Sequence, residues 1–394
     1  MAPTDKSTSA FYGFLSSRWA NTIRYSLMNL FIIAGLITIA LGGWWMWAGL
    51  FLSFVIAGLL EELVGDARDG ERLPPTWYLN LMLFLTWPLL LVLTVTCLNI
   101  IGPGIEFFDR ILFAAGFDPV AARDDTGLFT GSGGLVSLGM FYGLAGVNVA
   151  HELVHRTKSR FSLIMGRWLL AFTWDTGFAI EHVYGHHRHV GTTKDPATAR
   201  RGETVWFFIV RSTVGQVISA IRFENARLER RKIANNIFTN VYWRGQLMSL
   251  LVVLLYVSMV GPIGILYSAF SAAVGKIYLE AVNYIEHYGL VRIEGQPIAE
   301  RHSWDSHRRI STGMTYNLPL HSSHHRFASR PFWKLQHAYG KAPVLPMGYM
   351  PMIFCAAWPP YWKKISEPLL KNWDQNLASP QERKYLADIG ELRG

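Results

Sequence analysis

The chain has 394 residues, of which 51% are hydrophobic and 16% charged, and its formal net charge is +9. Soluble domains carry roughly 25% charged residues, so this composition favours an integral membrane protein. Two cysteines, Cys97 and Cys355, are too few for a disulfide framework or for a fused redox module built on CxxC pairs. The cationic residues flank hydrophobic runs, which indicates orientation in a lipid bilayer, and we expect no nucleic-acid partner.

Six apolar runs approach the roughly 20 residues that a helix needs to cross the hydrocarbon core. In chain order they are Tyr25–Leu41, Trp44–Leu60, Trp77–Cys97, Leu128–Ala150, Leu247–Val260 and Ile263–Tyr284. Gly42-Gly43 joins the first pair and Gly261-Pro262 the last pair, so each pair is expected to form a tight helical hairpin. The first run starts 24 residues in and lacks a small-x-small cleavage site, so we expect a span there and not a signal peptide.

The charges of the connecting segments predict an orientation. Residues 151–245 hold 15 Lys and Arg and residues 286–394 hold 14, whereas residues 102–130 hold two, with five acids. The positive-inside rule then places both long basic segments and both termini in the cytoplasm. We therefore expect one all-α membrane domain, residues 1–394, with six transmembrane helices and a cytosolic cap formed by 151–245 and 286–394.

Eight of the 13 histidines fall in three tight clusters, and a ninth, His287, follows the last span. Histidines three or four positions apart lie one turn apart on one face of a helix, where they can converge on a metal. Packing gives no reason to gather imidazoles at this spacing just past the ends of membrane spans. The clusters are His151 and His155; His182, His186 and His187; and His321, His324 and His325.

Nine histidines are too many for one tetrahedral zinc, which takes four ligands. Two ions with four or five ligands each would use all of them. Imidazole suits iron, zinc, copper and nickel alike, so ligand type alone leaves the metal open.

The clusters and their surroundings resemble the integral-membrane alkane 1-monooxygenase family, which includes the membrane hydroxylases of xylene and cymene. Glu181–His187 matches the family's EHxxGHH box, His151–His155 its HExxH box, and Asn283–Leu290 its signature. The resemblance implies a cytosolic, histidine-rich di-iron centre in a multi-pass protein of the bacterial inner membrane. Its two iron ions would be ligated by His151, His155, His182, His186, His187, His287, His321, His324 and His325.

The resemblance further implies hydroxylation of the terminal methyl of a medium-chain alkane with O2. Two electrons would come from a separate carrier, either a rubredoxin or a [2Fe–2S] ferredoxin-type reductase, docked on the basic cytosolic face. The third box departs from the alkane type, with Leu320, Ser323 and Arg326 where Arg, Asp and Ala are usual. Lys276, Glu280 and the tail around residues 372–375 look more like the xylene-type members, so a methyl hydroxylase of alkyl aromatics is the alternative.

The residues alone leave three other functions open. Membrane fatty-acid desaturases and hydroxylases also carry three histidine clusters, although the Asn283–Leu290 match argues against them. His151-Glu152-x-x-His155 fits the HExxH motif of an intramembrane zinc protease, which leaves most of the clustered histidines unexplained. A metal transporter would place its ligands along the spans instead of at their ends.

Several further polar residues are expected near the metal or inside the bundle. Metal-bound imidazoles usually donate their second ring N–H to a carboxylate or a carbonyl. Lys276 and Glu280, four apart inside a span, should pair because buried charge is costly in a membrane. His189 and His337 are expected to be structural. For His302 and His307 a structural role is favoured over a role behind the ligands or in a proton relay. The candidates behind the ligands are Glu152, Glu181, Asp195, Glu286 and His302.

Overall fold

A computed structural model describes residues 13–393, and every regular element in that range is helical. Seven helices are long and apolar enough to cross a membrane. Six of them overlap the six expected spans, and the seventh, α12 (Val205–Arg230), lies in a segment expected to belong to the cap. The six are α2 (Arg18–Leu41), α3 (Ala48–Val64), α4 (Thr76–Ile101), the continuous helix α7 to α8 (Leu128–Val154), α13 (Val241–Val260) and α14 (Gly264–His287).

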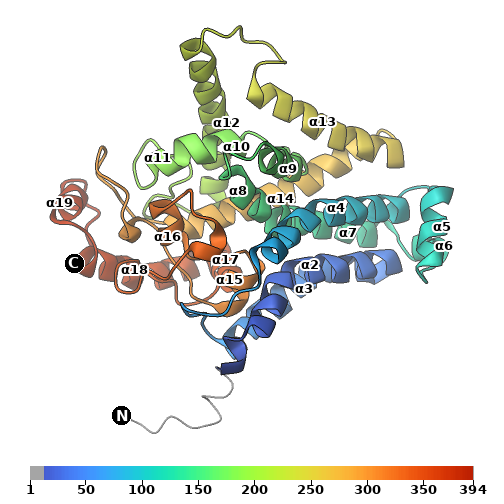
Figure 1. Ribbon diagram of the computed structural model, residues 1–394, viewed down its shortest axis with the longest axis horizontal. Coiled ribbons are helices and arrows are strands. Elements are labelled where there is room, and N and C mark those ends of the chain that lie inside the picture. The colour runs from blue at the N-terminus through green and yellow to red at the C-terminus, as the bar shows by residue number, and fades with distance from the viewer. Residues whose placement is uncertain (1–12, 394) are drawn as a thin grey trace.

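These six helices run lengthwise through the molecule, and most of the shorter helices lie towards its two ends (Figure 1). One end carries α5 (Glu106–Ala114) and α6 (Pro119–Asp124). α9 (Arg160–Ala171) and α10 (Phe178–Glu181) lie near the middle. Towards the other end lie α11 (His187–His189), α15 (Arg309–Met314), α16 (His321–Arg326), α17 (Tyr349–Ala357), α18 (Pro359–Asn376) and α19 (Pro380–Asp388).

Both expected hairpins are confirmed. Gly42, with φ of 68°, ends α2, and Gly261, with φ of 76°, ends α13. Both adopt left-handed backbone conformations that glycine allows at little cost. Trp44 and Trp45 are exposed at the first turn, as expected of an aromatic belt.

Glycines bring α7 and α14 into close contact. A Cβ added at Gly139 would lie 2.6 Å from the carbonyl oxygen of Ser271, and one added at Gly143 would lie 2.9 Å from that of Gly275. Small residues four apart permit such backbone approach between membrane helices, where dispersion and hydrogen bonds replace the hydrophobic driving force. In the same region Lys276 pairs with Glu280 at 2.7 Å, as expected, and also with Asp175 at 2.6 Å.

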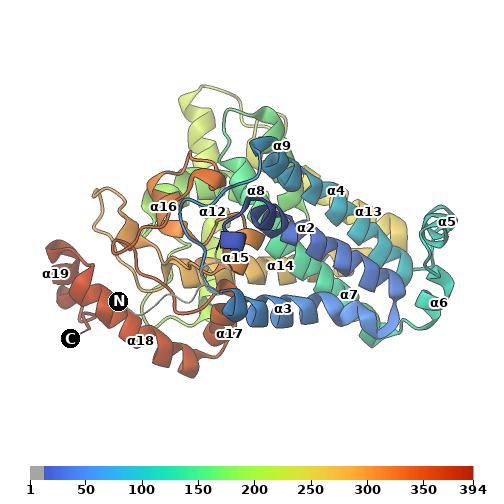
Figure 2. The ribbon, with the colours of Figure 1, turned by 60° about the horizontal axis from the view of Figure 1, so that its bottom comes forward.

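α12 runs across the lengthwise helices instead of along them, in both views (Figures 1 and 2). Near its N-terminus, the Glu203 carbonyl accepts a hydrogen bond from Tyr284, close to the C-terminal end of α14. Near its C-terminal end, the Glu224 carboxylate accepts one from the backbone of Val241, the first residue of α13. Because α13 and α14 are antiparallel neighbours, both of these contacts lie at the same end of the bundle.

α12 has a buried seam and an exposed apolar stripe. Phe208, Ser212, Gln216 and Ala220 recur every four residues along the seam and face the protein. Its exposed apolar side chains are Trp206, Phe207, Val210, Val214, Val217 and Ile218, which also follow helical spacing.

Candidate metal centre

All nine predicted histidines converge at one end of the bundle, where they form two groups. The first group has five members, His151, His155, His182, His187 and His324. The second group has four, His186, His287, His321 and His325. Within each group, one nitrogen from every ring lies within 4.8 Å of the others.

A π-helical turn divides the second cluster between the groups. In η3 (His182–His186) the backbone N–H of His187 donates to the carbonyl of His182, five residues earlier. This wider turn brings side chains five apart close together, whereas an α-helix would point them to different sides. The Nε2 atoms of His182 and His187 are 3.1 Å apart, while His186 belongs to the four-histidine group. Helical spacing in the sequence did not predict this division.

The nitrogen separations fit metal binding. The Nε2 atoms of His187 and His324 are 3.0 Å apart, and so are those of His287 and His321. A metal–nitrogen bond is about 2.1 Å long, so two nitrogens at this separation can bind the same ion.

The ring nitrogens that face the groups lack other partners. In the described part of the chain, the buried Nε2 atoms of His151, His155 and His186 have no hydrogen-bond partner. Burial lowers the pKa of His155 to about 3 and, with the neighbouring histidines, holds that of His324 well below its usual range. Neutral imidazoles with free lone pairs are the form that ligates a metal.

Two carboxylates stand behind the four-histidine group. Asp195 Oδ2 lies 2.8 Å from His186 Nδ1 and accepts a hydrogen bond from Thr198. Burial alone would raise the pKa of Asp195, but His186 and Thr198 outweigh it and lower the pKa. Glu286 Oε1 lies 3.3 Å from His321 Nδ1 and accepts a 2.8 Å hydrogen bond from the Tyr349 hydroxyl. The hydrogen bond from Asp195 orients the His186 ring, whereas Glu286 lies close to His321 without a hydrogen bond to it.

The other three candidates behind the ligands have different partners. Glu152 pairs with Arg156 at 2.9 Å, because residues four apart meet on one helix face. Glu181 accepts a hydrogen bond from Ser219, and burial followed by the charge of Asp195 raises its pKa well above the usual range. The ring of His302 lies between Glu382 Oε1, at 2.8 Å, and the backbone N–H of Ala299.

His189, His307 and His337 lie outside both groups. His337 Nδ1 is 2.8 Å from Asp69 Oδ1, and the His307 ring packs against that of His337 at 4.6 Å between centroids.

A small cavity opens onto both groups. It measures about 30 Å³ and reaches His151 and His182 of one group and His321 of the other. Its remaining lining is mostly apolar, with polar side chains close to the histidines: Gly143, Leu144, Val147, Asn148, Phe178, Tyr278, Leu279, Val282, Asn283, Glu286, Thr315, Leu318 and Tyr349. No motif in the sequence marks Asn148 or Tyr349, although Asn148 precedes His151 by one helical turn.

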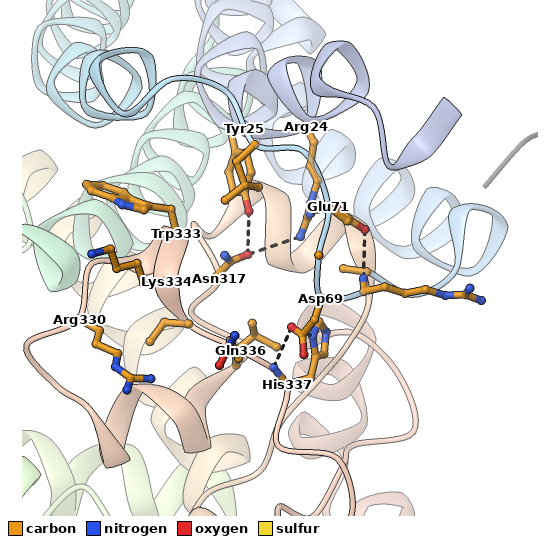
Figure 3. A pocket seen from close by; sticks show the side chains of 16 residues that line it. Arg24, Tyr25, Asp69, Glu71, Asn317, Arg330, Trp333, Lys334, Gln336 and His337 are labelled. Carbon is orange, nitrogen blue, oxygen red and sulfur yellow. Dashed lines mark hydrogen bonds and ion pairs between the residues drawn. The ribbon is translucent and has the colours of Figure 1, made fainter. Parts of the chain in front are cut away.

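Two larger hollows with basic linings flank the site. One, of about 700 Å³, contains Lys194, Arg200 and Arg222 and reaches Asp195, the residue bonded to His186. The other, of about 560 Å³, lies beside Leu320 of the third cluster (Figure 3). Arg330 and Lys334 lie on one side of that hollow, and the bonded pair of Asp69 and His337 on the other.

Comparison with known proteins assigns the family. The fatty acid desaturase family model matches residues 128–356, which contain all three clusters. Alkane 1-monooxygenase 2 of Alcanivorax borkumensis is 32% identical over 265 residues, which are 66% of this chain and 68% of that protein. The chain belongs to the alkane 1-monooxygenase family.

Other relatives support the same family. Alkane 1-monooxygenase 1 of Pseudomonas aeruginosa is 34% identical over 246 residues, which span 63% of that relative. The hydroxylase component of xylene/toluene monooxygenase from Pseudomonas putida is 28% identical over 378 residues, 95% of this chain and 96% of that protein. The resemblance to the alkane 1-monooxygenase family read from the histidine boxes is therefore confirmed.

Proposed function

We propose that this member of the alkane 1-monooxygenase family is a membrane-bound, non-haem di-iron monooxygenase. It hydroxylates the terminal methyl of a medium-chain alkane with O2 and two electrons. The observation that carries the proposal is the division of nine histidines into two donor groups beside one mostly apolar cavity. Bound iron supplies the activation of O2 and the attack on an unactivated C–H bond.

The chain's own residues hold, orient and enclose the reacting groups. The neutral imidazoles would present lone pairs to the ions, while Asp195 fixes the ring of His186 and Glu286 lies 3.3 Å from His321 Nδ1. The cavity has room only for the end of a hydrocarbon, so the rest of the chain must displace side chains such as Leu144 and Val282. Specificity then rests on shape, because an alkane offers no polar handle.

The contacts support six spans in an inner membrane, with the site on the cytoplasmic side. His155 and His287 place the C-terminal ends of α8 and α14 at the site, so the turn at Gly261 lies at the far end of the bundle. The acidic segment 102–130 belongs to that far end, whereas the basic segments surround the site, as the positive-inside rule requires.

α12 is then a helix of the membrane surface and not a seventh span. Its two ends contact the cytoplasmic ends of α14 and α13, and it lies across the bundle. Its exposed stripe, which includes Trp206, Phe207 and Val210, would rest in the inner leaflet at the boundary between headgroups and acyl chains.

The electron carrier, a rubredoxin or a [2Fe–2S] ferredoxin-type protein, would dock at the hollow containing Lys194, Arg200 and Arg222. The charge of this hollow complements an acidic carrier. Asp195 lines this hollow and is hydrogen-bonded to His186, so it connects the docking site to the histidines. Among the described residues, the hollow beside Leu320 has no such contact with a histidine of either group.

The alternative supported by a specific observation is methyl hydroxylation of an alkyl aromatic. The match to the xylene/toluene monooxygenase component extends over 95% of this chain. The two reactions share the attack on a methyl group and differ in the shape of the apolar slot. A desaturase shares the family model, and a zinc protease does not explain the second histidine group.

A competition assay with octane, p-xylene and p-cymene under 18O2 tests the proposal. The chain in lipid nanodiscs, supplied with iron, carrier and reductase, should give labelled 1-octanol as the main product. A dominant benzylic alcohol would show that the preferred substrate is an alkyl aromatic and not an alkane. Unlabelled alcohols, or an alkene, would refute a monooxygenase.

A further inference from the structure

Two buried amides without partners face the cavity between the histidine groups. Asn148 is 7% exposed, and neither its Nδ2 nor its Oδ1 has a hydrogen-bond partner in the described part of the chain. Asn283 is 5% exposed, and its Nδ2 likewise has no partner there. Burying a polar group without a partner costs free energy, so these side chains are expected to bind something in the working enzyme.

The position of the amides ties them to the reacting centre. Asn148 precedes His151 by three residues on α8, and Asn283 precedes His287 by four on α14. Each amide thus lies one helical turn from a histidine of a different group. Together they flank the part of the cavity where the new C–O bond would form.

Apart from the histidines, two other polar side chains of the cavity already have partners. The Tyr349 hydroxyl donates to Glu286, and the Tyr278 hydroxyl lies 3.5 Å from Met350 Sδ. A ligand that satisfies Asn148 must accept from Nδ2 and donate to Oδ1. A hydroxyl group does both, a hydrocarbon does neither, and a cavity of about 30 Å³ admits a group of that size.

We propose that Asn148 and Asn283 form a hydroxyl-binding subsite, whose ligand is a primary alcohol with its oxygen beside the histidine groups and its alkyl chain along the apolar lining. This inference rests on the proposed function, in which such an alcohol is the product. The subsite makes the alcohol a tighter ligand than a hydrocarbon of the same length, and hence a competitive product inhibitor.

The test measures ligand binding without turnover. Iron-loaded protein in nanodiscs, with no electron donor, is melted with 1-octanol or with 1-chlorooctane, which has a similar chain but cannot donate a hydrogen bond. The wild type should be stabilised more by 1-octanol than by 1-chlorooctane. Asn148→Leu and Asn283→Leu should lose this difference, with about tenfold weaker alcohol binding.

Asn29→Leu is the matched control. Asn29 is also a buried amide, but it donates to the Met82 carbonyl at 2.9 Å and accepts from Thr86. Its replacement should lower the melting temperature and keep the preference for alcohol. Asn148→Leu, which removes unpartnered atoms, should not lower the melting temperature of the ligand-free protein.

If Asn148→Leu and Asn283→Leu both kept the preference for alcohol, the proposed subsite would be refuted. The two amides would then bind only water. Failure of the wild type to form labelled alcohol under 18O2 would instead overturn the proposed reaction. The two failures are therefore distinguishable.

Discussion

The Nε2 atoms of His182 and His187 lie 3.1 Å apart although five positions separate the residues, while His186, the neighbour of His187, belongs to the other group. Adjacent residues therefore belong to different histidine groups. The π turn makes this possible because it changes which side chains share a face of the helix.

Replacement of these neighbours should remove metal from different positions. His186→Ala and His187→Ala should each lose about half of the iron, and the double variant nearly all of it, because each ring belongs to a separate group. Iron per chain, measured by mass spectrometry on purified protein, checks this. His189→Ala is the control and should keep the wild-type content. Complete loss of iron in both single variants would mean that the two groups do not fill separately.

Asp195→Asn should weaken iron at the four-histidine group. Loss of a carboxylate behind a metal-bound imidazole typically costs about 10–100-fold in affinity, and Asp195 is 2.8 Å from His186. Chelator competition should show one population of iron released earlier than in the wild type. Asp69→Asn, which removes the carboxylate beside His337, should release iron as the wild type does. Equal behaviour of the two variants would assign Asp195 a purely structural role.

Arg222→Glu should raise the carrier concentration needed for half-maximal coupled NADH oxidation, because it removes a positive charge from the proposed docking site. Added salt screens the attraction between opposite charges, so it should reduce the difference between this variant and the wild type. Lys334→Glu makes the same change in the other hollow and should leave that concentration near the wild-type value. Product formation with saturating carrier should be unchanged in both variants. A larger effect of Lys334→Glu would move the docking site to the hollow of Figure 3.

A fluorophore attached to the exposed apolar stripe of α12 should be in contact with lipid. A fluorophore on Phe207→Cys should be quenched by brominated acyl chains, and a fluorophore on Glu229→Cys, near the polar end of the helix, should be quenched by aqueous iodide. Cys97 and Cys355 are buried and should not react under native conditions. Iodide quenching at both positions would place the stripe in water and refute a surface helix.

Much of the architecture could be read from the sequence because hydropathy and clustering are strong local signals. Each of the six expected runs overlaps one of the long lengthwise helices, and all nine expected histidines meet. α12 was not predicted as a long apolar helix, because Arg211 and Arg222 interrupt its apolar stripe and lower the mean hydropathy of the segment.

Partners set by tertiary packing could not be read in the same way. Glu152, next to His151, forms an ion pair with Arg156, whereas Asp195, nine residues after His186, is bonded to it. Sequence proximity to a ligand does not determine which carboxylate lies behind it, because adjacent side chains on a helix point in different directions. The unpartnered state of Asn148 is likewise a property of the packed cavity.

The four-histidine group joins His186 to His325, and the Arg201 side chain near the second cluster is held by Asp374, close to the end of the chain. During synthesis, neither donor set is complete until the third cluster has left the ribosome, by which time all six spans have been made. Under the proposed function, both iron sites would be completed only after the lengthwise helices have been made. A chain truncated before α16 should therefore insert with both donor sets incomplete.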